Sequence, residues 1–190
     1  MYLYHYFEKS RGPFRTLSDI SFEKAKIILS NIKINNPSLT PPDIDSFLSR
    51  RQELETLVYQ KFIEKGGEPV RKKPQHMTVE KCDYLETWYS EPDYIKIPIE
   101  EFDINKISFT YGDMFPVFNP RLNKGEEYRN EVYTYDEILV LIKKYGLPQF
   151  VDKEYEFPAE CYIEACIWDD KVIDKYKKDW KEKNKKIDIM

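Results

Sequence analysis

The chain has 190 residues, of which 41% are hydrophobic and 15% aromatic, and its formal net charge is −4. This length suits one domain, expected to span residues 1–190, with a sizeable buried core. The acidic balance argues against a domain that binds duplex nucleic acid, because such domains neutralise phosphates with a basic surface.

The cysteine and histidine content argues against a structural metal site. There are three cysteines and two histidines, and the cysteines show no CxxC spacing, so we expect no metal. Unpaired thiols indicate a reducing compartment. The chain shows neither a signal-peptide pattern nor the roughly 20 apolar residues of a membrane span. We therefore expect a soluble, cytoplasmic protein without a membrane partner.

The first third of the chain is predicted to form a strand and two helices. Residues 2–7 alternate in the manner of a strand, and residues 22–33 keep a helical period of apolar side chains. A proline-rich linker at 35–42 precedes a second helix that runs to about residue 65. Its arginines and glutamates, Glu55 among them, are expected to lie largely off its apolar face.

The middle of the chain is predicted to contain three short strands, at residues 76–79, 94–99 and 107–111. His76 is expected to be a surface residue at the start of the first. Pro98 lacks a backbone N–H, so the second strand should lie at a sheet edge. The second and third strands are expected to pair as neighbours.

Two further helices have clear signals, and a third is short. Residues 82–89 are predicted to form the short helix, with Trp88 turned inward. Thr134 and Glu137 form a capping box at the start of a longer helix. A terminal helix keeps an amphipathic stripe of Ile173, Tyr176 and Trp180.

The order of these elements predicts the fold class. Strand, two helices, strands, helix, strand and helix follow one another without strict alternation of strand and helix. The sequence therefore predicts an α+β fold, with a mixed, mainly antiparallel sheet of about five or six strands and about four main helices.

A late strand, at residues 159–168, carries a carboxylate where strands normally carry none. Cys161, Ile163, Ala165 and Ile167 alternate with Tyr162, Glu164, Cys166 and Trp168. Glu164 therefore projects among two aromatic rings and a cysteine. A glutamate in such surroundings is either paired or functional.

Three predicted strands each present one polar side chain beside aromatic residues: His5, Tyr111 and Glu164. Their order resembles the ADP-ribosyltransferase fold, in the branch whose site carries histidine, tyrosine and glutamate on successive core strands. The chain also looks like an uncharacterised family of small bacterial proteins that carry the segments 109–113 and 162–165. We expect the three side chains to share one cleft.

The resemblance implies an NAD-dependent transferase that acts on a protein or nucleic-acid target. In that reaction Glu164 would hold the ribose 2′-hydroxyl and stabilise developing positive charge, Tyr111 would stack on the nicotinamide, and His5 would bond the adjoining ribose. Family members also hold the phosphates with an arginine. The candidates here are Arg15, Arg50, Arg51 and Arg71.

Two other functions stay open from the sequence. The chain would be a non-enzymatic binding protein if an aromatic cleft recognises a partner and Glu164 orients it. It would be an RNA-acting enzyme if residues 71–73 and the arginines of the second helix hold phosphates. Each site residue also has a structural interpretation, namely a core histidine for His5, a packing ring for Tyr111 and a salt bridge for Glu164.

Overall fold

A computed structural model describes residues 1–35, 41–150 and 161–185 of the chain. The described part has an antiparallel five-stranded sheet and four long helices, which confirms the predicted α+β class. The strands are β1 (Tyr2–Glu8), β2 (Gln75–Val79), β3 (Pro92–Pro98), β4 (Ile107–Thr110) and β5 (Glu164–Ile167). The helices are α1 (Phe22–Asn35), α2 (Ile44–Glu64), α3 (Asp83–Glu86), α4 (Met114–Val117), α5 (Tyr135–Tyr145) and α6 (Lys171–Lys185).

The strands lie in the order β3-β1-β2-β5-β4, and each pairs antiparallel with its neighbours. The predicted edge position of β3 is confirmed. The prediction that β3 and β4 are neighbours is wrong, because three strands from distant parts of the chain lie between them. The interior strand β5 comes last in the sequence, so the sheet is completed only by long-range pairing.

The two faces of the sheet carry different side chains. Directly opposed residues on antiparallel strands project to the same face. One face therefore carries Leu3 with Val79, and Met77 with Ala165 and Phe109. The other carries one row across the whole sheet: Lys96, Tyr4, Thr78, Glu164 and Thr110. The predicted alternation is confirmed from Tyr162 to Trp168, because the apolar residues there divide between separate cores. The strand is shorter than predicted, and Cys161 packs with Tyr162 rather than with Ile163.

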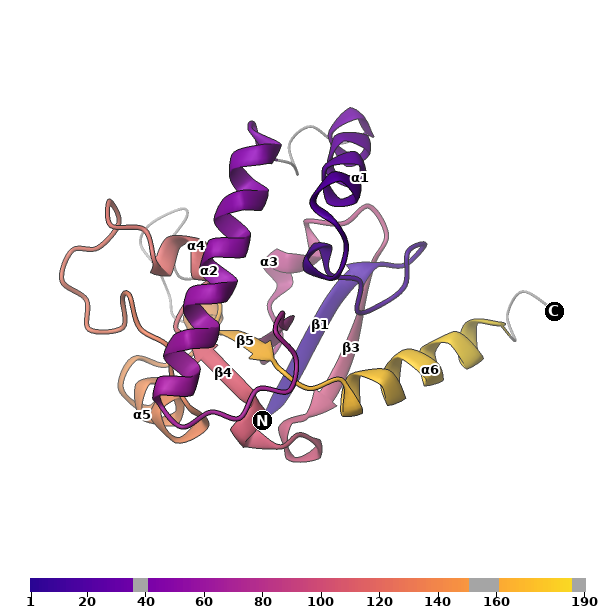
Figure 1. The fold of residues 1–190 in the computed structure, drawn as a ribbon. Coiled ribbons are helices and arrows are strands. Elements are labelled where there is room, and N and C mark those ends of the chain that lie inside the picture. Colours follow the sequence, from indigo (N-terminus) through magenta and orange to yellow (C-terminus); the bar gives the residue numbers. More distant parts are fainter. Residues whose placement is uncertain (36–40, 151–160, 186–190) are drawn as a thin grey trace.

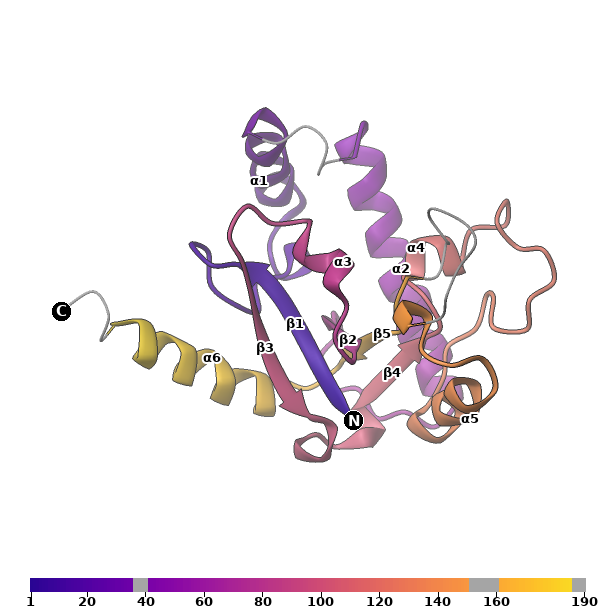
Figure 2. The same cartoon turned by 180° about the vertical axis from the view of Figure 1, so that it is seen from behind.

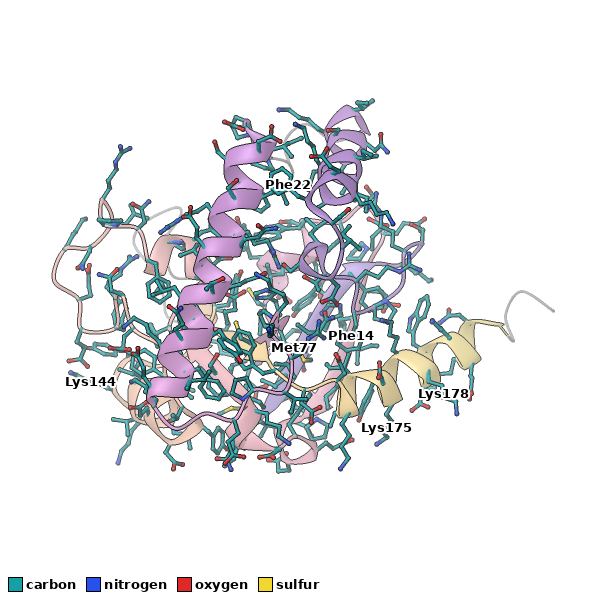
Figure 3. All side chains as sticks on the ribbon, in the orientation of Figure 1. Phe14, Phe22, Met77, Lys144, Lys175 and Lys178 are labelled. Carbon is teal, nitrogen blue, oxygen red and sulfur yellow. The ribbon has the colours of Figure 1, made fainter. Side chains whose placement is uncertain are left out.

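Helices cover both faces of the sheet. In Figure 1, α2 crosses in front of the strands, and from behind in Figure 2 the strands lie nearer the viewer. Leu54, Val58 and Phe62 of α2 pack with Trp168 on the Glu164 face, and side chains fill the space between them (Figure 3). The opposite face packs against Ile138 of α5, and α6 extends away from the sheet toward the C-terminus (Figures 1 and 2).

Several local predictions are confirmed and others are not. The capping box of Thr134 and Glu137 is present at α5. The helix predicted at 82–89 is the short α3, and Trp88 is 40% exposed rather than inward. Most of the predicted linker at 35–42, and residues 159–160 of the predicted late strand, lie outside the described residues. Among the described helices, none has the length and apolar character needed to cross a membrane.

The hydrogen bond between Trp168 and Ser108 gives a test of the core against which α2 packs. Trp168 Nε1 donates to Ser108 Oγ over 2.9 Å, and both residues are fully buried. Ser108→Ala should lower the free energy of unfolding by about 1–3 kcal/mol, because the buried indole N–H loses its acceptor. Urea unfolding measures this. The exposed Ser49→Ala on α2 is the control and should change it by less than about 0.5 kcal/mol; equal losses would contradict the prediction.

Candidate functional site

The candidate site is centred on a histidine held between two buried carboxylates. His76 Nδ1 lies 2.7 Å from Glu164 Oε1, and His76 Nε2 lies 3.3 Å from Glu55 Oε1. Glu164 is 6% exposed and Glu55 is fully buried. The His76 side chain keeps 18% exposure, so the imidazole is the member of this trio that reaches solvent most.

The sheet register brings His76 and Glu164 together. His76 on β2 pairs directly with Cys166 on β5, and Thr78 pairs with Glu164. His76 and Glu164 are therefore diagonal neighbours on one face, within side-chain reach. The expectation that His76 is a surface residue at a strand start is wrong, because β5 and α2 cover it.

Glu55 reaches the site from α2, although it was expected off the apolar face of this helix. It lies seven residues after Leu48 and seven before Phe62, and all three are buried. A spacing of seven residues returns a helical side chain to nearly the same face. This heptad spacing was the available signal for Glu55, but a glutamate four residues after Arg51 also fits an ordinary exposed ion pair.

Polar and cationic groups surround Glu55. Arg51 lies 3.0 Å from Glu55 Oε1 and Lys73 lies 3.6 Å from Oε2, while the Ser18 hydroxyl also donates to Oε1. Arg71 contacts Asp19 and Asp170. Lys73 and Arg71 of the predicted basic segment 71–73 thus already have carboxylate partners.

Asp113 extends the site on the other side of Glu164. It precedes α4 and caps it, with Oδ1 accepting the Phe115 N–H over 2.7 Å. Its Oδ2 accepts the Tyr162 hydroxyl over 2.8 Å. Glu164 Oε2 accepts the Met114 N–H over 3.0 Å. The start of α4 therefore fixes both carboxylates through backbone donors. We call Glu55, His76, Asp113, Tyr162 and Glu164 the acid–histidine cluster.

Burial and mutual charge spread the pKa values of this cluster apart. Burial raises the pKa of Glu55, but the hydrogen bond from His76 and the charge of Arg51 outweigh it and bring the pKa to about 2. Burial, followed by the charge of Glu164, raises the pKa of Asp113 to about 6. Burial lowers the pKa of His76, yet the charge of Glu164 brings it well above its ordinary range. The imidazole is thus protonated and donates to both carboxylates.

Cys166 supplies a sulfur atom next to the histidine. Its Sγ lies 3.8 Å from His76 Nδ1. Burial raises the pKa of this thiol to about 11, so it is not an activated nucleophile. His76, Glu164 and Cys166 each offer one ligand atom, and these atoms lie within 4.8 Å of one another. Within the part of the chain that the structure describes, these three residues form a group that could hold a metal ion.

The prediction that His5, Tyr111 and Glu164 share a cleft is wrong. His5 lies two residues after Leu3 on β1 and therefore shares its face, which is opposite Glu164. Its ring stacks on Phe14, with ring centroids 4.2 Å apart. Tyr111 belongs to that same opposite core. The predicted alternation of side chains along each strand was correct. Which side chains of two strands lie on the same face depends on the register between the strands, and a single sequence does not reveal that register.

His5 and Tyr111 instead make structural contacts. The Phe14 N–H donates to His5 Nε2 over 2.8 Å, so His5 Nδ1 carries the ring proton and donates to the His76 carbonyl over 3.1 Å. Burial lowers the pKa of His5 to about 4, which keeps the ring neutral. The Tyr111 hydroxyl donates to the Gly146 carbonyl over 3.0 Å.

Two of the four candidate arginines, Arg51 and Arg15, differ in position. Arg51 belongs to the shell around Glu55, where it also donates to Ser18 Oγ over 3.0 Å. Arg15 is exposed. Arg51 is therefore linked to Glu164 only indirectly, through Glu55 and His76, whereas His5 and Tyr111 lie on the other face of the sheet.

The chain was compared with protein-family models, curated proteins and solved structures, and none of them matches it. The residues and their geometry are accordingly the basis for the functional assignment.

Asp113 gives a test of the electrostatics. Between about pH 4 and pH 6 the unfolded chain loses the Asp113 proton first, so the contribution of Asp113 to wild-type stability should decrease as the pH rises. Asp113→Asn keeps the cap but removes this penalty. From pH 4 to pH 7, the free energy of unfolding of the variant relative to wild type should therefore increase by up to about 3 kcal/mol.

Urea unfolding at each pH, with a chelator present to remove adventitious cations, measures this difference. Titrating groups outside the acid–histidine cluster are common to both proteins and cancel. A difference that stays constant from pH 4 to pH 7 would contradict the prediction.

Proposed function

We propose that the protein is an enzyme whose reaction takes place at the acid–histidine cluster. The observation that supports this is the placement of one imidazole between two buried carboxylates that come from different elements, Glu55 from α2 and Glu164 from β5. Burying ions costs several kcal/mol each, and apolar side chains of similar size are often equally stable. Clusters of this kind concentrate at sites that carry out chemistry.

The chemistry that fits is hydrolysis or group transfer on a polar substrate. Glu164 supplies fixed negative charge next to a ring that donates hydrogen bonds, and Asp113 adds a second carboxyl group beside it. A fixed negative charge stabilises positive charge that develops in a substrate, because the carboxylate is already oriented when the substrate binds. Arg51 and Lys73 have side chains 20% and 31% exposed, and with His76 they form the side of the cluster nearest solvent.

Conservative variants of the two glutamates test the proposal. Glu164→Gln and Glu55→Gln should reduce turnover at least about 100-fold, the usual contribution of a positioned acid or base. Stability should change by less than about 1.5 kcal/mol, because His76 can release its second proton when one carboxylate is lost. The substrate panel contains NAD, ADP-ribose, short RNA, phosphate esters, glycosides and peptides. Melting temperatures are recorded in parallel.

Glu53→Gln is the matched control, since Glu53 lies on the same helix with its side chain 65% exposed. It should leave both turnover and stability unchanged. If wild type turns over no member of the panel and both cluster variants lose about 3–5 kcal/mol, the cluster is a structural ion network and the proposal fails.

A second candidate is the NAD-dependent transferase implied by the sequence resemblance. The observation that favours it is that Arg51 and Glu164, one proposed for the phosphates and one for the ribose, belong to the same network through His76 and Glu55. A nucleotide phosphate would have to compete with Glu55 for Arg51. The roles expected for His5 and Tyr111 do not enter this version, since both lie on the other face of the sheet.

Thermal shift tests this candidate. NAD at about 100 times its dissociation constant should stabilise the folded protein by about 2.7 kcal/mol, which corresponds to a rise of several degrees in melting temperature. Arg51→Gln should abolish the rise and the exposed Arg15→Gln should keep it. No rise in wild type, or a rise that survives Arg51→Gln and disappears with Arg15→Gln, would exclude this version of the site.

A further inference from the structure

We infer that His76, Glu164 and Cys166 form a binding site for one divalent transition-metal ion of the zinc class. The inference rests on the proposed function in placing this ion at the reaction centre, while the binding itself rests on geometry alone. His76 Nδ1 lies 2.7 Å from Glu164 Oε1 and 3.8 Å from Cys166 Sγ.

The separations of the ligand atoms are close to those of a tetrahedral site. Zinc binds nitrogen and oxygen at about 2.1 Å and sulfur at about 2.3 Å, so its ligands lie roughly 3–4 Å apart. The three ligand atoms here lie within 4.8 Å of one another. A small side-chain movement that separates His76 from Glu164 by less than about 1 Å would admit the ion.

Two paired strands hold the three ligands rigidly. Cys166 is directly opposite His76, and Glu164 is two residues earlier on the same face of β5. The sequence led us to expect no metal because its three cysteines show no CxxC spacing and it has only two histidines. The sheet instead brings together a histidine and a cysteine that are 90 residues apart.

The surrounding groups are those that metal ligands commonly have. A metal-bound histidine usually donates its other N–H to a carboxylate, which orients the ring. His76 Nε2 lies 3.3 Å from Glu55 Oε1, and Arg51 and the Ser18 hydroxyl hold Glu55 in turn. The non-ligating oxygen of Glu164 accepts the Met114 N–H over 3.0 Å.

The donor set selects the class of ion. A thiolate, an imidazole and a carboxylate together suit zinc or cobalt(II), whereas magnesium and calcium prefer oxygen ligands alone. Binding releases the thiol proton of Cys166 and the Nδ1 proton of His76 to solvent, so two protons leave as one divalent cation enters. Three protein ligands leave a fourth position for water or substrate, as in catalytic zinc sites.

Cobalt(II) titration of the chelator-treated full chain tests the site. Wild type should bind one cobalt ion, with the visible absorption of a tetrahedral site and a near-ultraviolet band from the thiolate. Cys166→Ser and Cys166→Ala should remove the near-ultraviolet band. Glu55→Gln should keep the band and weaken cobalt affinity about 10–100-fold, because it changes only the support of the ligand histidine.

Cys82→Ser is the matched control, since Cys82 is buried outside the cluster, and it should change nothing. Near-ultraviolet circular dichroism verifies that each variant is folded. No cobalt absorption in folded wild type, or a band that survives both Cys166 variants, would overturn the inference.

The two proposals fail in different ways. Loss of turnover in Glu164→Gln with no cobalt bound to wild type would leave the acid–histidine cluster as an enzyme site without this metal. One tightly bound cobalt with no turnover on the panel would leave the metal site without the proposed enzymatic role.

Discussion

The contact between His76 and Glu164 is the interaction on which the arrangement of this molecule depends. It joins the neighbouring strands β2 and β5 on one face of the sheet, and through the other nitrogen of His76 it reaches Glu55 on α2. A buried ion pair stabilises a fold only when its remaining hydrogen-bonding groups are also satisfied. Here the Met114 N–H donates a hydrogen bond to Glu164. The Ser18 hydroxyl donates to Glu55, and Arg51 forms an ion pair with it.

The position of α2 is therefore determined twice over. Its apolar residues Val58 and Phe62 pack with the fully buried Trp168, and this contact is non-directional. Glu55 lies on the same heptad stripe and makes directional contacts, so it fixes the rotation of the helix and its position along its axis. Loss of one carboxylate from the polar contact can be answered by release of a proton from His76, whereas trimming the apolar contact leaves a cavity.

The sequence predicted those features that depend on neighbours in the chain. The capping box at Thr134 and the alternation around Glu164 are local patterns, and both are present. Whether His5 and Glu164 lie on the same face depends on the register between their strands, and a register error of one residue moves a side chain to the other face. His76 was misjudged for the same reason, since its burial comes from β5 and α2 rather than from its own strand.

His5 connects the opposite face of the sheet to the acid–histidine cluster through the backbone of His76. The paired residues of β1 and β2 are Leu3 with Val79 and Tyr4 with Thr78. Beyond them, the His5 ring bonds the His76 carbonyl and accepts the N–H of Phe14. Phe14, labelled in Figure 3, adopts a left-handed φ of 55° that is unfavourable for a bulky side chain.

Stacking and the hydrogen bond between Phe14 and His5 compensate for that backbone conformation. They also orient the neutral His5 ring. This ring donates to the His76 carbonyl, which lies beyond the residue pairs of the β1–β2 ladder. The backbone of His76 is thus held from one face of the sheet, while its imidazole meets two carboxylates on the other. A site built on such a doubly fixed strand residue keeps its geometry without help from mobile loops, which is what oriented charge or metal ligation requires.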